Sequence, residues 1–186
     1  MWQRLKKARD QRGFTLVELL VVIAIIGILA AIVAPNAFNA IEKGKVAAAE
    51  ADYKAIKAAA LNFYTDTGFW PMTTYKVGGL DKTWNDEKEC FVTGKSSPSE
   101  NPDGWNGPYL ERWPSKNPWG GTYTFKETSD VWKESGGSSD SGKERYLELT
   151  SVPDPAFQAL QRDLGTDTVQ QDSPTSTTVR ILISNE

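Results

Sequence analysis

The sequence contains no histidine and only one cysteine among its 186 residues. Histidine is the most common general base in enzymes and the most common transition-metal ligand, so its absence argues against triad chemistry and against a zinc site. The single Cys90 cannot form a disulfide within the chain, and it has no histidine partner to activate it as a nucleophile. We interpret Cys90 as a small, partly buried hydrophobic residue, and we do not expect the chain to be an enzyme.

The sequence also lacks a broad excess of positive charge. It has 21 Lys and Arg against 24 Asp and Glu, which gives a net charge of -3. Proteins that bind nucleic acids usually carry a basic patch, so no nucleic-acid partner is expected. The basic residues that do cluster lie within 1–13, where Asp10 is the only acidic residue: Arg4, Lys6, Lys7, Arg9 and Arg12.

A long apolar stretch follows this basic run, from Phe14 to Ala34. About 21 residues at ~1.5 Å each span roughly 30 Å, which is enough to cross the apolar core of a bilayer. A secretory signal would have a shorter apolar core and a small-residue cleavage site after it. The positive-inside rule places the basic run in the cytoplasm, so we expect a single-pass membrane helix with the rest of the chain on the other side.

The helical pattern continues beyond Pro35. Apolar residues recur there at spacings of three and four or their sums: Phe38, Ile41, Ala49, Tyr53, Ile56, Ala60 and Phe63. We therefore predict one helix from Phe14 to about Thr65, apolar all round in its first half and amphipathic in its second. The second half can pack on a globular domain, whereas the first half must lie in lipid or among copies of itself.

Glu18 is unusual because it places a carboxylate in the first turn of a helix that enters a membrane. Such a charge is unfavourable in lipid, and this favours a functional role. The alternative is an interfacial glutamate that reaches the head groups and interacts favourably with the N-terminal end of the helix dipole. Position alone leaves both interpretations open.

The run from Gly13 to Ala31, GFTLVELLVVIAIIGILAA, resembles the class III signal of type IV pilins and pseudopilins. The resemblance implies cleavage between Gly13 and Phe14 by a prepilin peptidase, followed by N-methylation of Phe14. It also implies that Glu18 of an incoming subunit pairs with the Phe14 amine of a neighbour during assembly. Gly27 and Pro35 stand where this family has helix-weakening residues. We expect a mild kink there in a free subunit in lipid, and either a kink or local melting in a filament.

A second resemblance lies in the loop after the helix. Segments 105–110, WNGPYL, and 113–123, WPSKNPWGGTY, resemble the loop before the first strand in the major pseudopilin of type II secretion. We expect the tryptophans to pack this loop onto the sheet, the alternative being a carbohydrate-binding platform. Residues 73–104 form a longer connection than is usual in that family.

The remaining pattern predicts a small antiparallel sheet. Residues 121–127 and 146–150 read as paired strands joined by the polar stretch 135–142, and residues 178–184 read as a third strand. Between them, residues 155–164 predict a short helix capped by Asp154. The expected fold is therefore α+β and type IV pilin-like, with a long N-terminal helix packed on a small antiparallel sheet.

Calcium is the one cofactor that the resemblance suggests, because major pseudopilins hold their last loop with it. Asp140 is the first candidate ligand, and Asp130, Asp167 and Asp172 are less plausible ones. The spacing of these residues is not specific for calcium. A solvated loop without metal is the preferred interpretation.

Together these patterns predict three parts: a basic leader at 1–13, a membrane and polymerisation segment at 14–35, and a globular domain at 36–186 that includes the amphipathic half of the helix. The expected function is that of a structural subunit of a type IV pilus-like filament, best matched by a major pseudopilin of type II secretion. One alternative is a major or minor type IV pilin of a surface fibre for adhesion, motility or DNA uptake. The other is a membrane-tethered binding module.

The resemblance also implies partners and a location. The partners are copies of the chain, a prepilin peptidase, an inner-membrane assembly platform, minor pilins or pseudopilins, and lipid before assembly. The expected location is the bacterial inner membrane, with the leader in the cytoplasm and the globular domain in the periplasm. After assembly the subunit would lie in a periplasmic pseudopilus or an extracellular pilus.

Overall fold

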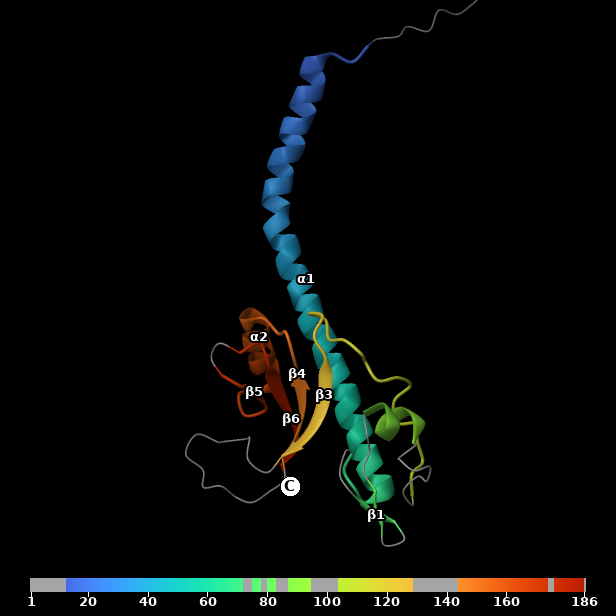
Figure 1. Cartoon of the computed structure of the whole chain (residues 1–186). Coiled ribbons are helices and arrows are strands. Elements are labelled where there is room, and N and C mark those ends of the chain that lie inside the picture. Colours follow the sequence, from blue (N-terminus) through green and yellow to red (C-terminus); the bar gives the residue numbers. More distant parts are fainter. Residues whose placement is uncertain are drawn as a thin grey trace, which may run out of the picture. The chain divides into compact units, whose positions relative to one another are not determined.

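The computed structural model describes residues 13–71, 75–77, 80–82, 87–94, 104–128, 144–173 and 176–185. A long helix comes first, and short strands and a second helix follow it (Figure 1). The elements in chain order are α1 (Leu16–Thr67), β1 (Tyr75–Val77), β2 (Leu80–Lys82), the π-helix η1 (Glu89–Thr93), β3 (Tyr123–Thr128), β4 (Glu144–Leu149), α2 (Asp154–Leu164), β5 (Val169–Gln171) and β6 (Val179–Asn185). The predicted α+β class is confirmed.

Helix α1 has 52 residues and agrees with the predicted helix to within about two residues at each end. Pro35 lies inside it. The helix stops because Gly68 takes the left-handed conformation, with φ of 71°, and its N–H donates to the Tyr64 carbonyl at 2.8 Å. The chain divides into two compact units, 1–41 and 42–186, and α1 contributes residues to both.

The second unit contains a four-stranded antiparallel sheet in the order β3-β4-β6-β5. Three of these strands were predicted, with ends that differ by a few residues, and the short strand β5 was not. The C-terminal strand β6 lies between β4 and β5, so the last residues of the chain complete the interior of the sheet. Strands β1 and β2 pair separately as a small hairpin. The polar stretch 135–142 lies outside the described residues.

Helix α2 begins one residue before the predicted helix and ends at the predicted residue. The prediction that Asp154 caps it is wrong. The N-cap residue is Pro153, whose extended backbone (φ -73°, ψ 153°) precedes the helix, and no side chain caps that end. Asp154 is already helical, and its carboxylate accepts a hydrogen bond from Gln158 Nε2 at 3.0 Å.

The core lies between the second half of α1 and one face of the sheet. The residues of α1 that enter it recur every three or four positions: Val46, Ala49, Tyr53, Ile56, Ala59, Ala60 and Phe63. They meet alternate residues of the strands, including Phe125, Leu147 and Ile181. Phe38 and Ile41 continue the sequence pattern but are 70% and 56% exposed. The stripe that packs on the core therefore begins at Val46, later than the pattern suggested.

The long connection after α1 contributes to this core through η1. Phe91 is fully buried, with its ring centroid 5.5 Å from Trp113 and 5.8 Å from Phe125. Cys90 beside it is also fully buried, which confirms its interpretation as a packing residue. Segment 87–94 is thus held in the fold by an aromatic anchor.

Candidate functional site

The first half of α1 exposes an unusually large number of apolar side chains. Every residue from Gly13 to Ile41 is exposed, and the apolar side chains lie all round the helix. Among the described residues, α1 is the helix that is long and apolar enough to cross a membrane. Apolar surface of this extent is not stable in water, so this segment requires lipid or other apolar helices around it.

Glu18 closes a reciprocal hydrogen-bonded cap at the start of α1. Its Oε2 accepts hydrogen bonds from the Thr15 N–H at 2.9 Å and from Thr15 Oγ1 at 2.7 Å. The Glu18 N–H lies 3.3 Å from Thr15 Oγ1 and donates to it. This is a capping box, which satisfies two N–H groups that have no partner inside the helix.

This capping role of Glu18 was not predicted from the sequence. The signal was present as Thr-x-x-Glu at positions 15 to 18, directly before an apolar run. The expected partners of Glu18 were chosen by charge alone: head groups, the N-terminal end of the helix dipole, or a Phe14 amine. The structure shows that the carboxylate of a single chain has a local partner.

The Gly13–Phe14 peptide bond lies just outside the helix. Gly13 to Thr15 have no regular secondary structure, and the Phe14 side chain is 83% exposed. A peptidase needs its target bond to be accessible and not helical, and this bond meets both conditions. The rest of the leader, 1–12, lies outside the described residues.

Gly27 and Pro35 both lie within α1, and the helix runs through them. A Cβ added at Gly27 would meet nothing within 4 Å. In the single chain, therefore, no neighbouring side chain requires glycine at this position. The predicted role of these residues in helix melting concerns the filament, and it stays a prediction.

In the second unit, three carboxylates of α1 bind the loop that precedes β3 and the first residue of that strand. Each accepts a hydrogen bond from an aromatic side chain: Glu42 Oε1 from Trp119 Nε1 at 2.6 Å, Asp52 Oδ2 from Tyr123 OH at 2.8 Å, and Asp66 Oδ2 from Tyr109 OH at 2.9 Å. Burial raises the pKa of Tyr123 far above its usual value, and the Asp52 carboxylate adds to this effect. Sequence analysis did not pair these residues, since 43 to 77 positions separate the partners.

The tryptophans of this loop are packing residues. Trp105, Trp113 and Trp119 are half-buried and pack against the core. Trp105 Nε1 also donates to the Cys90 carbonyl at 3.3 Å, and Trp113 stacks on Phe91. For these three residues the packing interpretation is confirmed.

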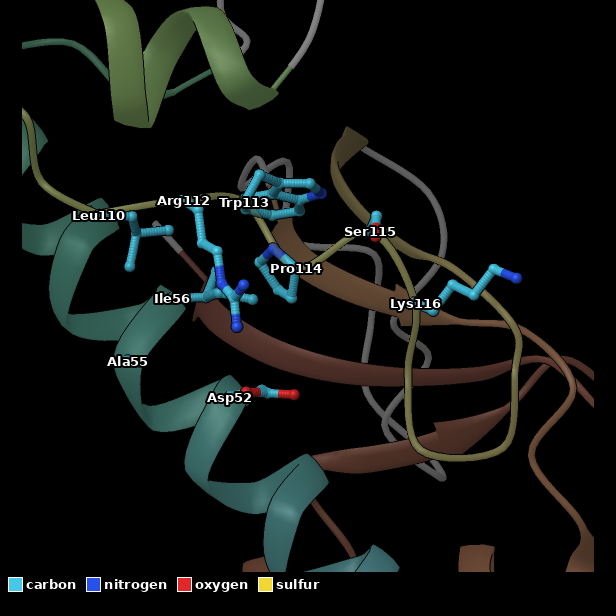
Figure 2. A pocket seen from close by; sticks show the side chains of 9 residues that line it. All are labelled: Asp52, Ala55, Ile56, Leu110, Arg112, Trp113, Pro114, Ser115 and Lys116. Atoms are coloured by element: carbon cyan, nitrogen blue, oxygen red, sulfur yellow. The ribbon is translucent and has the colours of Figure 1, made fainter.

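A cavity of about 420 Å³ lies between α1 and the loop 110–116 (Figure 2). The guanidinium of Arg112 extends toward Ile56 of α1, while Lys116 points away (Figure 2). The full lining is Asp52, Ala55, Ile56, Leu110, Arg112, Trp113, Pro114, Ser115 and Lys116. Ser115 is the only hydroxyl in this lining, and the lining contains no histidine that could activate it.

The predicted calcium ligands do not form a cluster in the described part of the chain. No group of three or more His, Cys, Asp or Glu that could hold a metal ion occurs among the described residues. Asp140 and Asp130 lie outside them. Asp172 forms an ion pair with Arg180 Nη2 at 2.9 Å. Calcium binding at Asp140 stays a prediction.

An exposed apolar helix that starts beside an accessible, non-helical peptide bond, with a globular unit after it, is the arrangement of type IV pilin-like subunits. Residues 8–34 match the family described as the prokaryotic N-terminal methylation motif, and residues 40–144 match the family described as PilW, C-terminal. Both matches agree with the pilin-like class. No solved structure matches the chain.

The curated relatives specify the family further. The chain is 37% identical over 118 residues to type II secretion system core protein G of Pseudomonas aeruginosa, covering 63% of this chain and 74% of the relative. It is 36% identical over 126 residues to core protein G of Vibrio cholerae, covering 68% and 77%. The fimbrial protein EcpC of Eikenella corrodens is 41% identical over 68 residues, covering 37% and 44%. The chain belongs to the family of type II secretion system core protein G, the major pseudopilins.

Proposed function

We propose that this protein is the major pseudopilin of a type II secretion system, a membrane-anchored subunit that polymerises with copies of itself. The observation that carries this proposal is that the apolar half of α1 is wholly exposed and overlaps an N-terminal methylation motif. The chain is also related to core protein G. The protein acts by assembly and not by catalysis. Its three parts are the leader at 1–13, the membrane and polymerisation segment at 14–35, and the globular domain at 36–186.

Processing at the Gly13–Phe14 bond prepares the subunit for assembly. A prepilin peptidase cuts this bond and N-methylates Phe14, which leaves a cationic amine four residues before Glu18. Before the cut, the nitrogen of Phe14 is a neutral amide. An unprocessed chain therefore has no cation at this point with which a carboxylate could pair.

Glu18 then changes partners during assembly. In the single chain its carboxylate is held by Thr15 within the capping box. In the filament, Glu18 of the incoming subunit pairs with the Phe14 amine of a neighbour, because a carboxylate in apolar surroundings is stabilised far more by a cation than by neutral donors. The pairing sets the axial register of the subunits.

Gly27 and Pro35 lower the stability of α1 locally, in the segment between them. Glycine is a poor helix former, and proline removes one backbone hydrogen bond. In the crowded filament this stretch melts locally, whereas the single chain keeps it helical.

The assembly needs partners that this chain does not supply. They are the peptidase, an inner-membrane platform, minor pseudopilins, and lipid around α1 before polymerisation. The subunit starts in the bacterial inner membrane with its globular domain in the periplasm. It ends in a periplasmic pseudopilus.

The test uses two substitutions that separate the two roles of Glu18. Glu18→Gln keeps an oxygen that can accept from Thr15 but removes the charge. Thr15→Val removes the capping hydroxyl at nearly constant shape and keeps the charge. We expect Glu18→Gln to abolish filaments in electron micrographs and Thr15→Val to retain most of them.

Mass spectrometry of the membrane-extracted protein completes the test. The expected N-terminus is methylated Phe14 in the wild type. An uncut chain, or filaments that survive Glu18→Gln, would contradict the proposal. If Thr15→Val were as damaging as Glu18→Gln, Glu18 would act as a cap rather than as a charge partner.

A surface pilus is the second candidate, favoured by the similarity to the fimbrial protein EcpC. That match covers 44% of the fimbrial protein, against 74% and 77% for the two core G proteins. Deleting the gene distinguishes the candidates. Loss of protein secretion supports the pseudopilin, and loss of sheared surface fibres with normal secretion supports the pilus.

A further inference from the structure

The strand order leaves β3 and β5 as the two outer strands of the sheet. An outer strand presents backbone N–H and C=O groups that can pair with another chain. Strand β5 offers little to pair with, because it has three residues and its Val169 carbonyl accepts from Gln161 Nε2 at 3.3 Å. Strand β3 is six residues long and is therefore the edge that needs protection.

The segment 87–94 lies against this edge. Glu87 Oε1 accepts a hydrogen bond from the Phe125 N–H of β3 at 2.9 Å. This is the position at which the carbonyl oxygen of an added strand would bind. The carboxylate therefore occupies one hydrogen-bonding site of an incoming strand.

The same segment is anchored firmly enough to act as a cover. The Phe91 ring packs against the Phe125 ring, and the Phe91 carbonyl accepts from the N–H groups of Tyr109 and Leu110 at 2.9 and 3.0 Å. These contacts hold the backbone of the segment independently of Glu87. Removing the Glu87 carboxylate should thus expose the edge without detaching the segment.

We propose that segment 87–94 is an edge cover, in which Glu87 blocks β3 from pairing with the β3 strand of a second copy. The proposal builds on the proposed function, since a polymerising subunit meets other copies at very high local concentration. Assembly through α1 then proceeds in one register only if the sheets do not join edge to edge. The cover thus leaves the contacts between α1 helices possible and prevents pairing between the β3 strands of two copies.

The test uses the full-length chain in detergent micelles, where detergent surrounds the apolar half of α1. Three variants change Glu87: Glu87→Ala removes the carboxylate, Glu87→Asp shortens its reach but keeps the charge, and Glu87→Gln keeps both an acceptor oxygen and the length. Glu111→Ala is the control, because it removes an exposed glutamate elsewhere. A Thr124→Cys substitution on β3 in each background reports edge pairing by disulfide formation between copies.

We expect Glu87→Ala and Glu87→Asp to raise the cross-linked dimer at least several-fold, and to speed amide hydrogen exchange at Phe125 about tenfold or more. Glu87→Gln and Glu111→Ala should stay close to the wild type. Near-ultraviolet circular dichroism of the tryptophans checks that each variant is folded. Cross-linking at the wild-type level in folded Glu87→Ala, with faster exchange at Phe125, would overturn the proposal.

Unfolding of both Glu87→Ala and Glu87→Asp would also overturn it, because Glu87 would then hold the fold together and not merely block an edge. The proposed function has a separate readout. Loss of filaments in Glu18→Gln does not depend on Glu87, so either proposal can fail while the other stands.

Discussion

The two halves of α1 share one backbone conformation and have opposite environments. In the first half Val22 and Ile26 are 49% and 58% exposed, whereas in the second half Ile56 and Phe63 are 1% and 0% exposed. The first half is apolar on every side, and the second half carries its apolar residues as a stripe. The arrangement of apolar residues around a helix, not their number, therefore shows whether the helix can be covered by its own chain.

A consequence is that the two halves contribute to different processes. The buried stripe contributes to the free energy of unfolding of the globular unit. The exposed half contributes to the stability of the membrane-bound or assembled subunit, and only when lipid or other subunits cover it. Substitutions of the same type in the two halves should therefore have separate effects.

The largest expected effect is that of Phe63→Ala. Removing a fully buried phenylalanine should lower the free energy of unfolding of the globular unit by about 3–5 kcal/mol. Urea denaturation in detergent, followed by tryptophan fluorescence, measures this change. The matched substitution Ile26→Ala should leave this transition unchanged within about 0.5 kcal/mol. An equal loss in both variants would break the comparison.

Gly121→Ala tests how closely the loop packs on the sheet. A Cβ at this position would clash with the carbonyl oxygen of Thr150, so the backbone would have to shift. We expect a loss of about 1–3 kcal/mol in the same denaturation experiment. Gly120→Ala is a poor control because Gly120 has a φ of 88°. Gly44→Ala, in open space on α1, is the suitable one.

Tyr123→Phe tests the hydrogen bond between α1 and the first residue of β3. It removes the donor to Asp52 and should cost about 1–2 kcal/mol, because a half-buried carboxylate loses a partner. Tyr64→Phe is the control, since Tyr64 is 37% exposed and its hydroxyl makes no hydrogen bond within the described residues. Equal losses in the two variants would contradict this role of Asp52.

The pH dependence sharpens the same test. The pKa of Tyr123 is raised in the folded state, so above about pH 10 the unfolded chain loses a proton that the folded chain keeps. Stability from this tyrosine is fully present below that pH and is lost as the pH rises further. Tyr123→Phe should make the alkaline loss of stability smaller. Tyr109 and Tyr146, whose pKa values burial also raises, should account for part of the remainder.

The smallest expected effect compares glycines in the two halves of α1. Gly27→Ala and Gly44→Ala both place a methyl group in open space, and each should stabilise the helix by about 0.5–1 kcal/mol. Only Gly27→Ala should reduce filament yield, because it strengthens the stretch proposed to melt. Thermal melting by circular dichroism and electron microscopy measure the two outcomes. Normal filaments in Gly27→Ala would argue against melting.

Much of this organisation could be predicted because it depends on local patterns. The long helix, its change of character, the helix at 155–164 and three strands of the sheet follow from periodicity and turn residues. Strand β5 was missed because three residues are too few to show alternation. The capping box at Thr15 and Glu18 was missed although Thr-x-x-Glu is its signature, because only the charge of Glu18 was considered.

The sequence pattern alone predicts that the first half of α1 lies in lipid or among copies, because a helix apolar on every side has no polar face to turn to water. The sequence also indicated the family through the motif at residues 13–31, most of which lies in the first half of α1. The pairing of each aromatic donor with its carboxylate on α1, and of the Phe125 N–H of β3 with Glu87, depends on the tertiary structure. Such partners lie tens of residues apart in sequence, and only the packing of the loop on the helix and the sheet brings them within hydrogen-bond distance.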